Sequence, residues 1–473
     1  MVWSRRAASL ALVTCCVVEL ITTTVTAGDD DTSDVELPEF DFLRQNEDWS
    51  VLSQLEPEQQ AGRFDRMKYI PVSAGDEDWI SVGGSFRLRY ESWRDFAFGA
   101  PPNDTDGFLL ARLLAHADFH LHRRSRIFLE LKAAQSTPRE LPGGTRALDV
   151  DSFDLQQGFV DVDVGPEARG QFVLRVGRQA LSIGRQRLVS PLPWGNSLRS
   201  WDGVTMTMRP KGWNVAAFWT AFAPVLQYEF NEPDADWQFS GTVASRLGRR
   251  FNFEAYALWL DRGDPVTFNG TTGPESRYTV GGRGWTTFGR GRIDVEIARQ
   301  LGSVGAGDIE ATMATVELNL ELARFARLIV GVDYASGDRS PGGDVETFNQ
   351  LFPLGHAYLG YLDVVGRQNV LDASVGLSFR PVKRLEVFAM VHLLQRAEST
   401  DAVYNPGGGV VIPATAGTSR DIGTELDTVF RYTPSRYTLI ELGLGRLFAG
   451  ELPEQAGSGE DIDFAYLQFE YRF

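Results

Sequence analysis

Apolar and polar residues alternate along most of this chain beyond Asp78. The period of two is clearest in residues 80–91, 109–121 and 463–473. In 109–121 one face carries leucine, alanine and phenylalanine, whereas the other face carries Arg112 and further polar side chains. Side chains alternate between the two faces of a β-strand, while an α-helix repeats about every 3.6 residues. The pattern therefore predicts half-buried strands.

We expect about eighteen such strands, most of them about 9 to 12 residues long. This length exceeds the usual ~5–6 residues of a strand in a soluble sheet and matches a tilted crossing of a bilayer. An even number is expected for a bacterial barrel made from one chain. The predicted strands are 80–91, 109–121, 126–134, 153–164, 171–178, 201–209, 212–221, 237–247, 250–261, 277–287, 291–300, 311–321, 326–335, 371–380, 384–395, 419–431, 436–447 and 463–473.

The connections between these strands alternate in length. Short connections such as 122–125, 210–211 and 381–383 alternate with long stretches rich in glycine, proline and aspartate, such as 336–370 and 396–418. Short periplasmic turns and long extracellular loops are typical of outer-membrane barrels, whereas propellers and sandwiches have shorter strands. The predicted fold class is all-β, a transmembrane antiparallel β-barrel of about 18 strands.

The first residues have the three parts of a secretory signal peptide. Arg5 and Arg6 precede an apolar run at 7–18, and Val25-Thr26-Ala27 fits the cleavage pattern of small residues. Export of this kind places the protein in the bacterial outer membrane, because the rest of the chain has no apolar run long enough for a spanning helix. The predicted division is a signal peptide at 1–27, an N-terminal periplasmic segment at 28–79 and an outer-membrane barrel at 80–473.

The two ends of the mature chain carry further local signals. In the periplasmic segment, Phe40 to Leu52 is expected to form a short helix or a plug-like element. At the other end, residues 464–473 alternate apolar and polar side chains and stop on Phe473. This resembles the C-terminal strand by which outer-membrane barrels are recognised for assembly. The alternative interpretation is an ordinary edge strand at a chain end.

Composition narrows the class of function. The chain carries a formal net charge of -17, so it would repel nucleic-acid phosphates, and no nucleic-acid partner is expected. Its only cysteines, Cys15 and Cys16, lie in the predicted signal peptide, which leaves the mature chain without a disulfide or a thiolate nucleophile. No GxSxG motif and no complete nucleotide-binding glycine motif occurs. We therefore expect no enzymatic activity and no cofactor.

Strand alternation predicts which charges face the inside of the barrel. An arginine facing lipid at mid-membrane costs about 2–4 kcal/mol, so the polar face of each strand must line the lumen. Asp161 and Asp163 lie on the strand next to Arg175, so a cross-strand ion pair is expected there. Two interpretations stay open: the inward charges pair among themselves, or some arginines face the channel and select anions. The inward charges include Arg87, Arg89, Arg112, Arg175, Asp161, Asp163, Asp294, Glu296, Asp333, Glu425, Asp427 and Glu441.

The segment 176–201 departs from strand alternation. It contains Arg178, Arg185, Arg187 and Arg199 among glutamine, asparagine and tryptophan residues. Arginine offers a planar fork to carboxylates, and tryptophan offers a flat face to sugar rings. The segment is therefore either a loop that contacts carboxylates and sugars or a basic surface loop facing anionic lipopolysaccharide. Spacing alone does not separate the two.

Acidic residues gather at one point in a predicted loop and strand. Asp149, Asp151 and Asp154 allow two interpretations, a calcium site or a solvated acidic loop. The loop is favoured because the spacing of an EF-hand is absent.

Several motifs of the chain occur together in one known family. They are Asp154 to Val164, Val176-Gly177-Arg178-Gln179, Gly184-Arg185-Gln186-Arg187-Leu188, Trp194, Asn196, Arg199, Asp202-Gly203, Phe352-Pro353, His356, Gly360-Tyr361-Leu362-Asp363, Gln368-Asn369, Asp421-Ile422-Gly423-Thr424-Glu425-Leu426-Asp427 and Tyr471-Arg472-Phe473. Through them, most of residues 40–473 resembles the bacterial alginate-export outer-membrane porins. The resemblance implies an 18-stranded monomeric barrel with an arginine-rich pore that passes anionic polyuronate.

The expected function is passive export or diffusion of an anionic polysaccharide such as alginate through an arginine-lined channel. The alternatives are a general small-anion or sugar-acid porin, and a surface adhesin or receptor that acts through its long loops. Besides the polysaccharide, the expected partners are outer-membrane lipid, lipopolysaccharide and the barrel-assembly machinery. The predicted pore-lining and substrate-binding residues are Arg87, Arg89, Arg112, Arg175, Arg178, Arg185, Arg187, Arg199, Asp202, Glu425 and Asp427.

Overall fold

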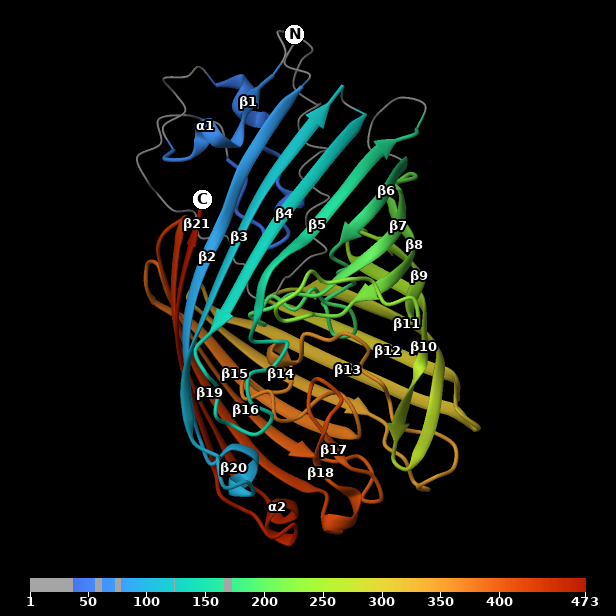
Figure 1. Cartoon of the computed structure of the whole chain (residues 1–473). Helices are drawn as coiled ribbons and strands as arrows, with labels where there is room; N and C mark the ends of the chain where they lie inside the picture. The colour runs from blue at the N-terminus through green and yellow to red at the C-terminus, as the bar shows by residue number, and fades with distance from the viewer. Residues whose placement is uncertain (1–36, 56–61, 73–77, 123, 166–171) are drawn as a thin grey trace.

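The computed structural model describes residues 37–55, 62–72, 78–122, 124–165 and 172–473, so the predicted signal peptide lies outside the described residues. These residues form a closed antiparallel β-barrel, a 19-stranded sheet made of 18 wall strands and the short strand β1 (Ile70–Pro71) (Figure 1). The wall strands are β2 (Trp79–Arg94), β3 (Asp106–Leu121), β4 (Ser125–Ser136), β5 (Asp151–Asp163), β6 (Phe172–Gln179), β7 (Ser200–Met208), β8 (Trp213–Ala223), β9 (Trp237–Arg246), β10 (Phe251–Phe268), β11 (Thr271–Phe288), β12 (Gly291–Val304), β13 (Gly307–Ala323), β14 (Ala326–Ala335), β15 (Val370–Val382), β16 (Leu385–Gln395), β19 (Asp421–Ser435), β20 (Thr438–Ala449) and β21 (Ile462–Arg472). The predicted fold class and each of the eighteen predicted strands are confirmed.

The barrel closes where its first and last wall strands meet. β2 pairs with β3 on one side and with β21 on the other, from Ser85 opposite Arg472 to Arg94 opposite Asp463. Beyond the end of β21, β1 takes up the free edge of β2, with Ile70 opposite Ile80. Closure satisfies the backbone N–H and C=O groups of every wall strand, which a sheet must achieve inside a bilayer.

The two faces of each strand differ as the alternation predicts. On β3, Leu109 and Leu113 are 40% and 42% exposed on the outer surface, whereas Leu110 and Arg112 between them are buried. Large apolar side chains on the outside of a barrel are stable because lipid, not water, surrounds them. The charges predicted to face inward are on the buried face, and Arg175 among them is half-buried.

The strands of two hairpins extend further than predicted. β10 runs to Phe268 instead of ending near residue 261, and β12 runs to Val304 instead of ending near residue 300. Pro265 breaks the alternation, and a shift of register between Arg262 and Val266 accommodates it within the hairpin. A bulge of this kind lets a strand pass a proline that lacks a backbone donor. The hairpins therefore project from the long-loop, extracellular end of the barrel.

The N-terminal segment lies at the end of the barrel where the short turns are, beside the C-terminus (Figure 1). It forms the short 3-10 helices η1 (Arg44–Asn46) and η2 (Trp49–Gln54) and the helix α1 (Asp65–Lys68). Part of it reaches into the lumen, since the amide of Gln45 bonds the side chain of Gln157 on β5 at 3.1 Å. The segment expected to be helical or plug-like thus contains short helices and contacts the inner wall.

The remaining elements lie in the extracellular connections. They are η3 (Phe96–Gly99), η4 (Gly355–Ala357), η5 (Ala414–Ala416), α2 (Glu451–Gln455) and the hairpin of β17 (Val403–Tyr404) and β18 (Val410–Ile412). None of the helices within the described residues is long and apolar enough to cross a membrane.

Candidate functional site

The connection between β6 and β7 folds into the barrel instead of projecting from it. We call residues 180–199 the first inner loop. At one end its main chain meets Arg87 and Arg112 of β2 and β3, and at the other Arg187 meets Asp294 of β12. These strands lie on nearly opposite walls of an 18-stranded ring, so the loop crosses the lumen. The interpretation of this segment as a basic surface loop is therefore wrong.

Local contacts give the first inner loop a defined shape. Its two limbs meet through an antiparallel bridge between Ile183 and Val189, with Ile183 N donating to Val189 O at 3.1 Å. The turn between them requires a positive φ of 62° at Gln186. Ser190 Oγ donates to Gln186 Oε1 at 2.7 Å, which holds this disfavoured conformation in place.

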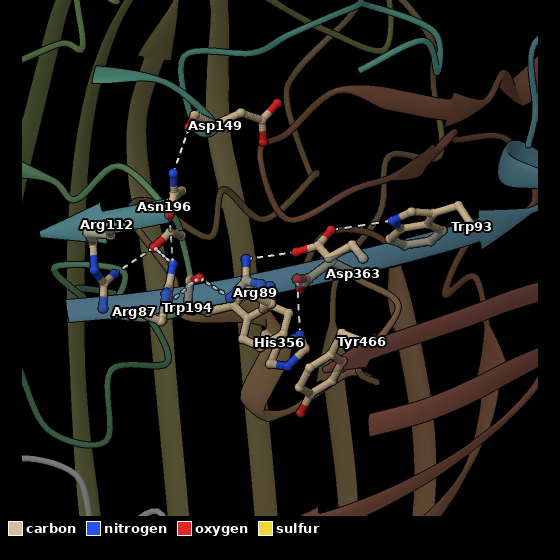
Figure 2. A network of polar contacts seen from close by, with 12 residues as sticks. Arg87, Arg89, Trp93, Arg112, Asp149, Trp194, Asn196, His356, Asp363 and Tyr466 are labelled. Carbon is tan, nitrogen blue, oxygen red and sulfur yellow. Dashed lines mark hydrogen bonds and ion pairs between the residues drawn. The ribbon is translucent and has the colours of Figure 1, made fainter. Parts of the chain in front are cut away.

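Arg87 and Arg112 bind the tip of the first inner loop through its main-chain carbonyls (Figure 2). Arg87 donates to the carbonyl oxygens of Pro193, Trp194 and Gly195 at 3.0, 3.1 and 2.8 Å. Arg112 donates to Pro193 O and Gly195 O at 3.0 and 2.8 Å. Neither guanidinium has a carboxylate within 4.0 Å among the described residues, so both keep a positive charge that no acid neutralises directly.

A stack of three side chains continues this network (Figure 2). The guanidinium of Arg89 lies 3.7 Å from the ring centroid of Trp194, and it pairs with Glu91 at 2.8 Å. The opposite face of Trp194 stacks on His356, with centroids 3.5 Å apart and planes at 10°. His356 Nδ1 lies 3.2 Å from Asp363 Oδ2. The stack therefore joins the wall, the first inner loop and a second loop.

The second loop is the connection between β14 and β15, of which residues 349–369 fold inward; we call this part the second inner loop. It runs beside the first, with Ser190 N donating to Phe352 O at 2.8 Å and Phe352 N donating to Leu188 O at 2.9 Å. The ring of Phe352 packs against Trp201 and Phe239 at 5.2 and 5.0 Å. The sequence predicted this stretch only as a long extracellular loop, because no periodic pattern marks a loop that folds inward.

Glu425 and Asp427 anchor the second inner loop to β19. Glu425 Oε1 accepts the N–H of Leu362 at 2.9 Å, and Asp427 Oδ2 accepts the N–H of Tyr361 at 3.2 Å. Both carboxyl groups are fully buried. The structure thus places these two predicted pore-lining residues behind a loop, where they hold main-chain donors instead of facing an open channel.

Arg185 and Arg187 are neutralised by acids on the far wall. Arg185 pairs with Glu317 of β13 at 2.7 Å. Arg187 is 1% exposed and reaches Asp294 and Glu296 of β12 at 3.3 and 3.0 Å. Glu317 lies in a predicted strand, but nothing in the alternation of β13 identifies it as the partner of a loop over 100 residues away. These two arginines therefore secure the loop and do not present free charge.

The remaining predicted residues form pairs along the wall. Arg175 Nε lies 2.7 Å from Asp161 Oδ1 on the neighbouring strand, so the predicted cross-strand pair is present. Arg178 binds Asp202 at 2.7 Å and Asp154 at 3.4 Å. Asp154 is thus paired, as are the other two acids of its group, Asp149 with Arg146 and Asp151 with Lys132.

Arg199 ends the first inner loop without a carboxylate partner among the described residues. Its Nη1 donates to Pro353 O at 2.9 Å and to Ser190 O at 3.4 Å. The eight predicted arginines therefore fall into two groups. Five are paired with acids, which agrees with the interpretation that inward charges neutralise one another. The three whose described partners are neutral oxygen atoms are Arg87, Arg112 and Arg199.

A closed 18-stranded barrel with loops folded into its lumen defines the class of protein, an outer-membrane porin for export or diffusion. The alginate-export family model matches residues 78–463, and the chain belongs to this family. The family and fold are those of a non-enzymatic channel. No curated protein matches the sequence.

Solved structures of Pseudomonas aeruginosa porins share this fold. OpdQ is 10% identical with a TM-score of 0.58, over 83% of this chain and 97% of that chain. OccK11 (OpdR) is 12% identical with a TM-score of 0.54, over 83% and 96% of the two chains. OpdK, in a structure with vanillate, is 11% identical with a TM-score of 0.54, over 83% and 98%. At these identities the likeness extends to the fold alone.

Proposed function

We propose that this protein is a passive outer-membrane channel for an anionic polysaccharide, a uronate polymer such as alginate. Membership of the alginate-export family supports the substrate class. The observation that carries the proposal is the group of Arg87, Arg112 and Arg199, which lie inside the barrel and bind neutral carbonyl oxygens. Because no acid lies within ion-pair distance of them in the described chain, their charge favours anions in the lumen.

The inner loops support a second candidate, a porin for small anions or sugar acids. The first inner loop crosses the lumen and is held at both walls, which restricts the channel. A restricted channel admits a small acid more readily than a branched or folded polymer. OpdK, a structural neighbour, carries vanillate, a small aromatic acid, in its structure. The length of acidic oligosaccharide that permeates distinguishes the two candidates.

The chain is further proposed to mature by removal of residues 1–27, to act as a monomer and to sit among lipopolysaccharide. Its assembly is proposed to depend on β21, whose apolar and polar residues alternate up to Phe473.

Reversal potentials across a planar bilayer test the proposal. In a salt gradient at low ionic strength the wild-type channel should prefer anions, Arg199→Gln should reduce the preference, and Arg199→Glu should reduce it further or reverse it. The preference should weaken as salt rises, because the Debye length falls from about 10 Å at 0.1 M to about 3 Å at 1 M.

The control variant is Arg446→Gln, because Arg446 is exposed and paired with Asp461. Its selectivity should equal that of the wild type. A cation-selective wild-type channel would contradict the anion proposal. A channel that conducts no ions would favour the adhesin or receptor alternative, in which the long loops act alone.

A further inference from the structure

A cavity of about 340 Å³ lies between the barrel wall and the inner loops. Its wall includes Trp237 of β9, Arg262 of β10 and Glu275 of β11, and Arg199 lines it from the first inner loop. Arg262 and Glu275 belong to the part of the β10–β11 hairpin that extends toward the extracellular end. The tip of the β17–β18 hairpin, at 406–408, completes the cavity. The cavity therefore lies on the extracellular side of the inner loops.

Three polar atoms around this cavity are buried and have no hydrogen-bond partner within the described structure. They are Trp237 Nε1, Arg262 Nε and Glu275 Oε2. Buried donors and acceptors of a folded protein are nearly always paired, so three unpaired atoms on one cavity require an explanation. Two of them are donors and one is an acceptor. Each of the three is closed to water in the ligand-free barrel, so a ligand in the cavity reaches it when the side chain that carries it turns toward the ligand. Such a ligand would need both oxygen acceptors and a hydroxyl donor.

The charges around the cavity favour an anion. Arg199 and Arg262 both line it, and neither forms an ion pair with the described residues. Glu275 is the acid of this wall, but its Oε1 is already bound by Arg277 Nε at 2.5 Å and by Asn349 Nδ2 at 3.0 Å. Since Arg277 offsets the charge of Glu275, two guanidinium groups remain to bind a carboxylate.

An aromatic surface accompanies these charges. The guanidinium of Arg262 lies 3.9 Å from the ring centroid of Trp237, and Phe222 and Phe352 also line the cavity. Aromatic faces beside polar groups are typical of small-ligand sites, whose volumes run from about 300 to about 1,000 Å³. A volume at the lower end of this range matches one ring rather than a chain of several.

We propose that this cavity binds a single carboxylated sugar ring, either a free sugar acid or one residue of an acidic polysaccharide. Arg199 and Arg262 bind the carboxylate. On binding, Trp237 and Glu275 turn toward the ligand, so that the indole N–H donates to a ring or hydroxyl oxygen and Glu275 Oε2 accepts a hydroxyl proton. The assignment rests on the proposed anion channel for the choice of ligand class. It adds a defined extracellular binding site with a carboxylate end and a hydroxyl end.

Calorimetric titration of the purified full-length barrel tests the site, with sodium glucuronate as the probe. Glucuronate should bind, while glucose and acetate at the same concentrations should bind at least tenfold more weakly, because each lacks one half of the recognised group. Arg262→Gln should weaken glucuronate binding at least tenfold. Trp237→Phe retains an aromatic ring and removes the N–H, and it should weaken binding severalfold.

The matched control is Arg299→Gln, because Arg299 is an exposed arginine of neighbouring β12 that pairs with Glu310 outside the cavity. It should bind glucuronate as the wild type does. Each variant is first shown to be folded by its shifted migration on unheated gels. Equal binding of glucuronate and acetate overturns the sugar-ring assignment, and unchanged binding in Arg262→Gln overturns the site.

Bilayer recordings separate this inference from the proposed function. If the wild-type channel prefers anions but does not bind glucuronate, the site is wrong and the channel proposal stands. If glucuronate binds with the expected loss in Arg262→Gln but the channel is silent or cation-selective, the site stands and the proposed transport is wrong.

Discussion

Arg175 illustrates how a single charge inside this barrel acquires its role. Its Nε and Nη2 lie 2.7 and 2.8 Å from the two carboxylate oxygens of Asp161, and its guanidinium lies 3.7 Å from the ring centroid of Phe159. A two-point contact with a carboxylate fixes the plane of the guanidinium. Arg87, by contrast, binds three carbonyl oxygens, which carry no formal charge. The first arginine stabilises the wall, whereas the second, 3% exposed, holds the tip of the first inner loop without an acid to neutralise it.

Replacement of Arg175 by alanine should lower the stability of the barrel and leave ion selectivity nearly unchanged. The variant leaves Asp161 without its partner, which should cost about 1–3 kcal/mol because the pair is only partly exposed, at 22% and 11% for the two side chains. Denaturant unfolding in detergent measures the loss. Asp161→Ala in the same chain should recover part of it, since the unpaired carboxylate is then absent. A large change in reversal potential would show that Arg175 acts on solutes after all.

The first inner loop crosses the lumen, and its attachments to the two walls are unequal. At the far wall Arg187 holds acids of β12, whereas at the near wall its tip is held by five hydrogen bonds to main-chain carbonyls from Arg87 and Arg112. Arg89 Nη1 also donates to Trp194 O at 2.7 Å, and Asn196 Nδ2 donates to Ala111 O of β3 at 3.2 Å, so the two arginines share this attachment with other contacts.

Loss of the near-wall attachment should widen and loosen the channel. We expect the double variant Arg87→Gln, Arg112→Gln to fold, because both side chains lie on the inner face and leave the strand pairing intact. Its single-channel conductance should rise, with larger current fluctuations, because the loop tip loses five of its hydrogen bonds to β2 and β3. Single-channel recording measures both effects, and Arg446→Gln serves as the unaltered comparison. A conductance equal to that of the wild type would show that the far-wall ion pairs and the remaining contacts of Arg89 and Asn196 suffice to hold the loop.

At the scale of the whole molecule, the two ends of the described chain meet at the closure of the barrel. Lys68 Nζ donates to Phe473 O at 2.9 Å and to Val82 O at 3.1 Å, and Arg44 Nη2 donates to Phe473 O at 3.2 Å. The N-terminal segment therefore covers the point where β2 and β21 join. The segment also contains the partly buried acid Asp41, whose pKa is raised to about 6 by burial, with a further contribution from Glu47.

Docking of the N-terminal segment should depend on pH through Asp41. A carboxyl group whose pKa is raised from 3.8 to about 6 on docking stabilises the docked state fully below pH 3.8, and this contribution is lost as pH rises through 6. Asp41→Asn mimics the protonated form at every pH, so it should dock more firmly than the wild type above pH 6 and equally near pH 4. Hydrogen exchange of residues 40–54, corrected for intrinsic rates, measures docking.

Comparing Asp41→Asn with the wild type at the same pH cancels the effects of neighbouring titratable groups on docking. Some of these groups favour docking as pH rises and others oppose it. Burial also raises the pKa of Glu47, while it lowers the pKa of Lys68 to about 7, and both groups are present in the variant. An Asn variant that exchanges as fast as the wild type at neutral pH would contradict the assigned role of Asp41.

The wall of this barrel was determined by the sequence alone. Each strand has its own period-two pattern, and the bilayer requires a strand length near ten residues. The number of strands and the face on which each side chain lies therefore follow from local sequence, as does the pairing of Arg175 with Asp161. The predicted end of β10 is wrong because Pro265 interrupts the alternation there. A bulge accommodates this proline, and whether the strand continues past the bulge depends on its pairing with β11.

The interior was decided by the tertiary structure. The sequence identified Arg185, Arg187, Glu425 and Asp427 as inward or loop residues, but not that the first two bind acids on the far wall and the last two bind a loop. These contacts join segments from 63 to 132 residues apart, such as Arg185 with Glu317 and Leu362 with Glu425. A loop has no periodicity that orients its side chains, so its position depends on closure of the barrel around it. The strand pattern therefore predicts the barrel wall, whereas the folded loops decide which inward charges are paired with acids and which are not.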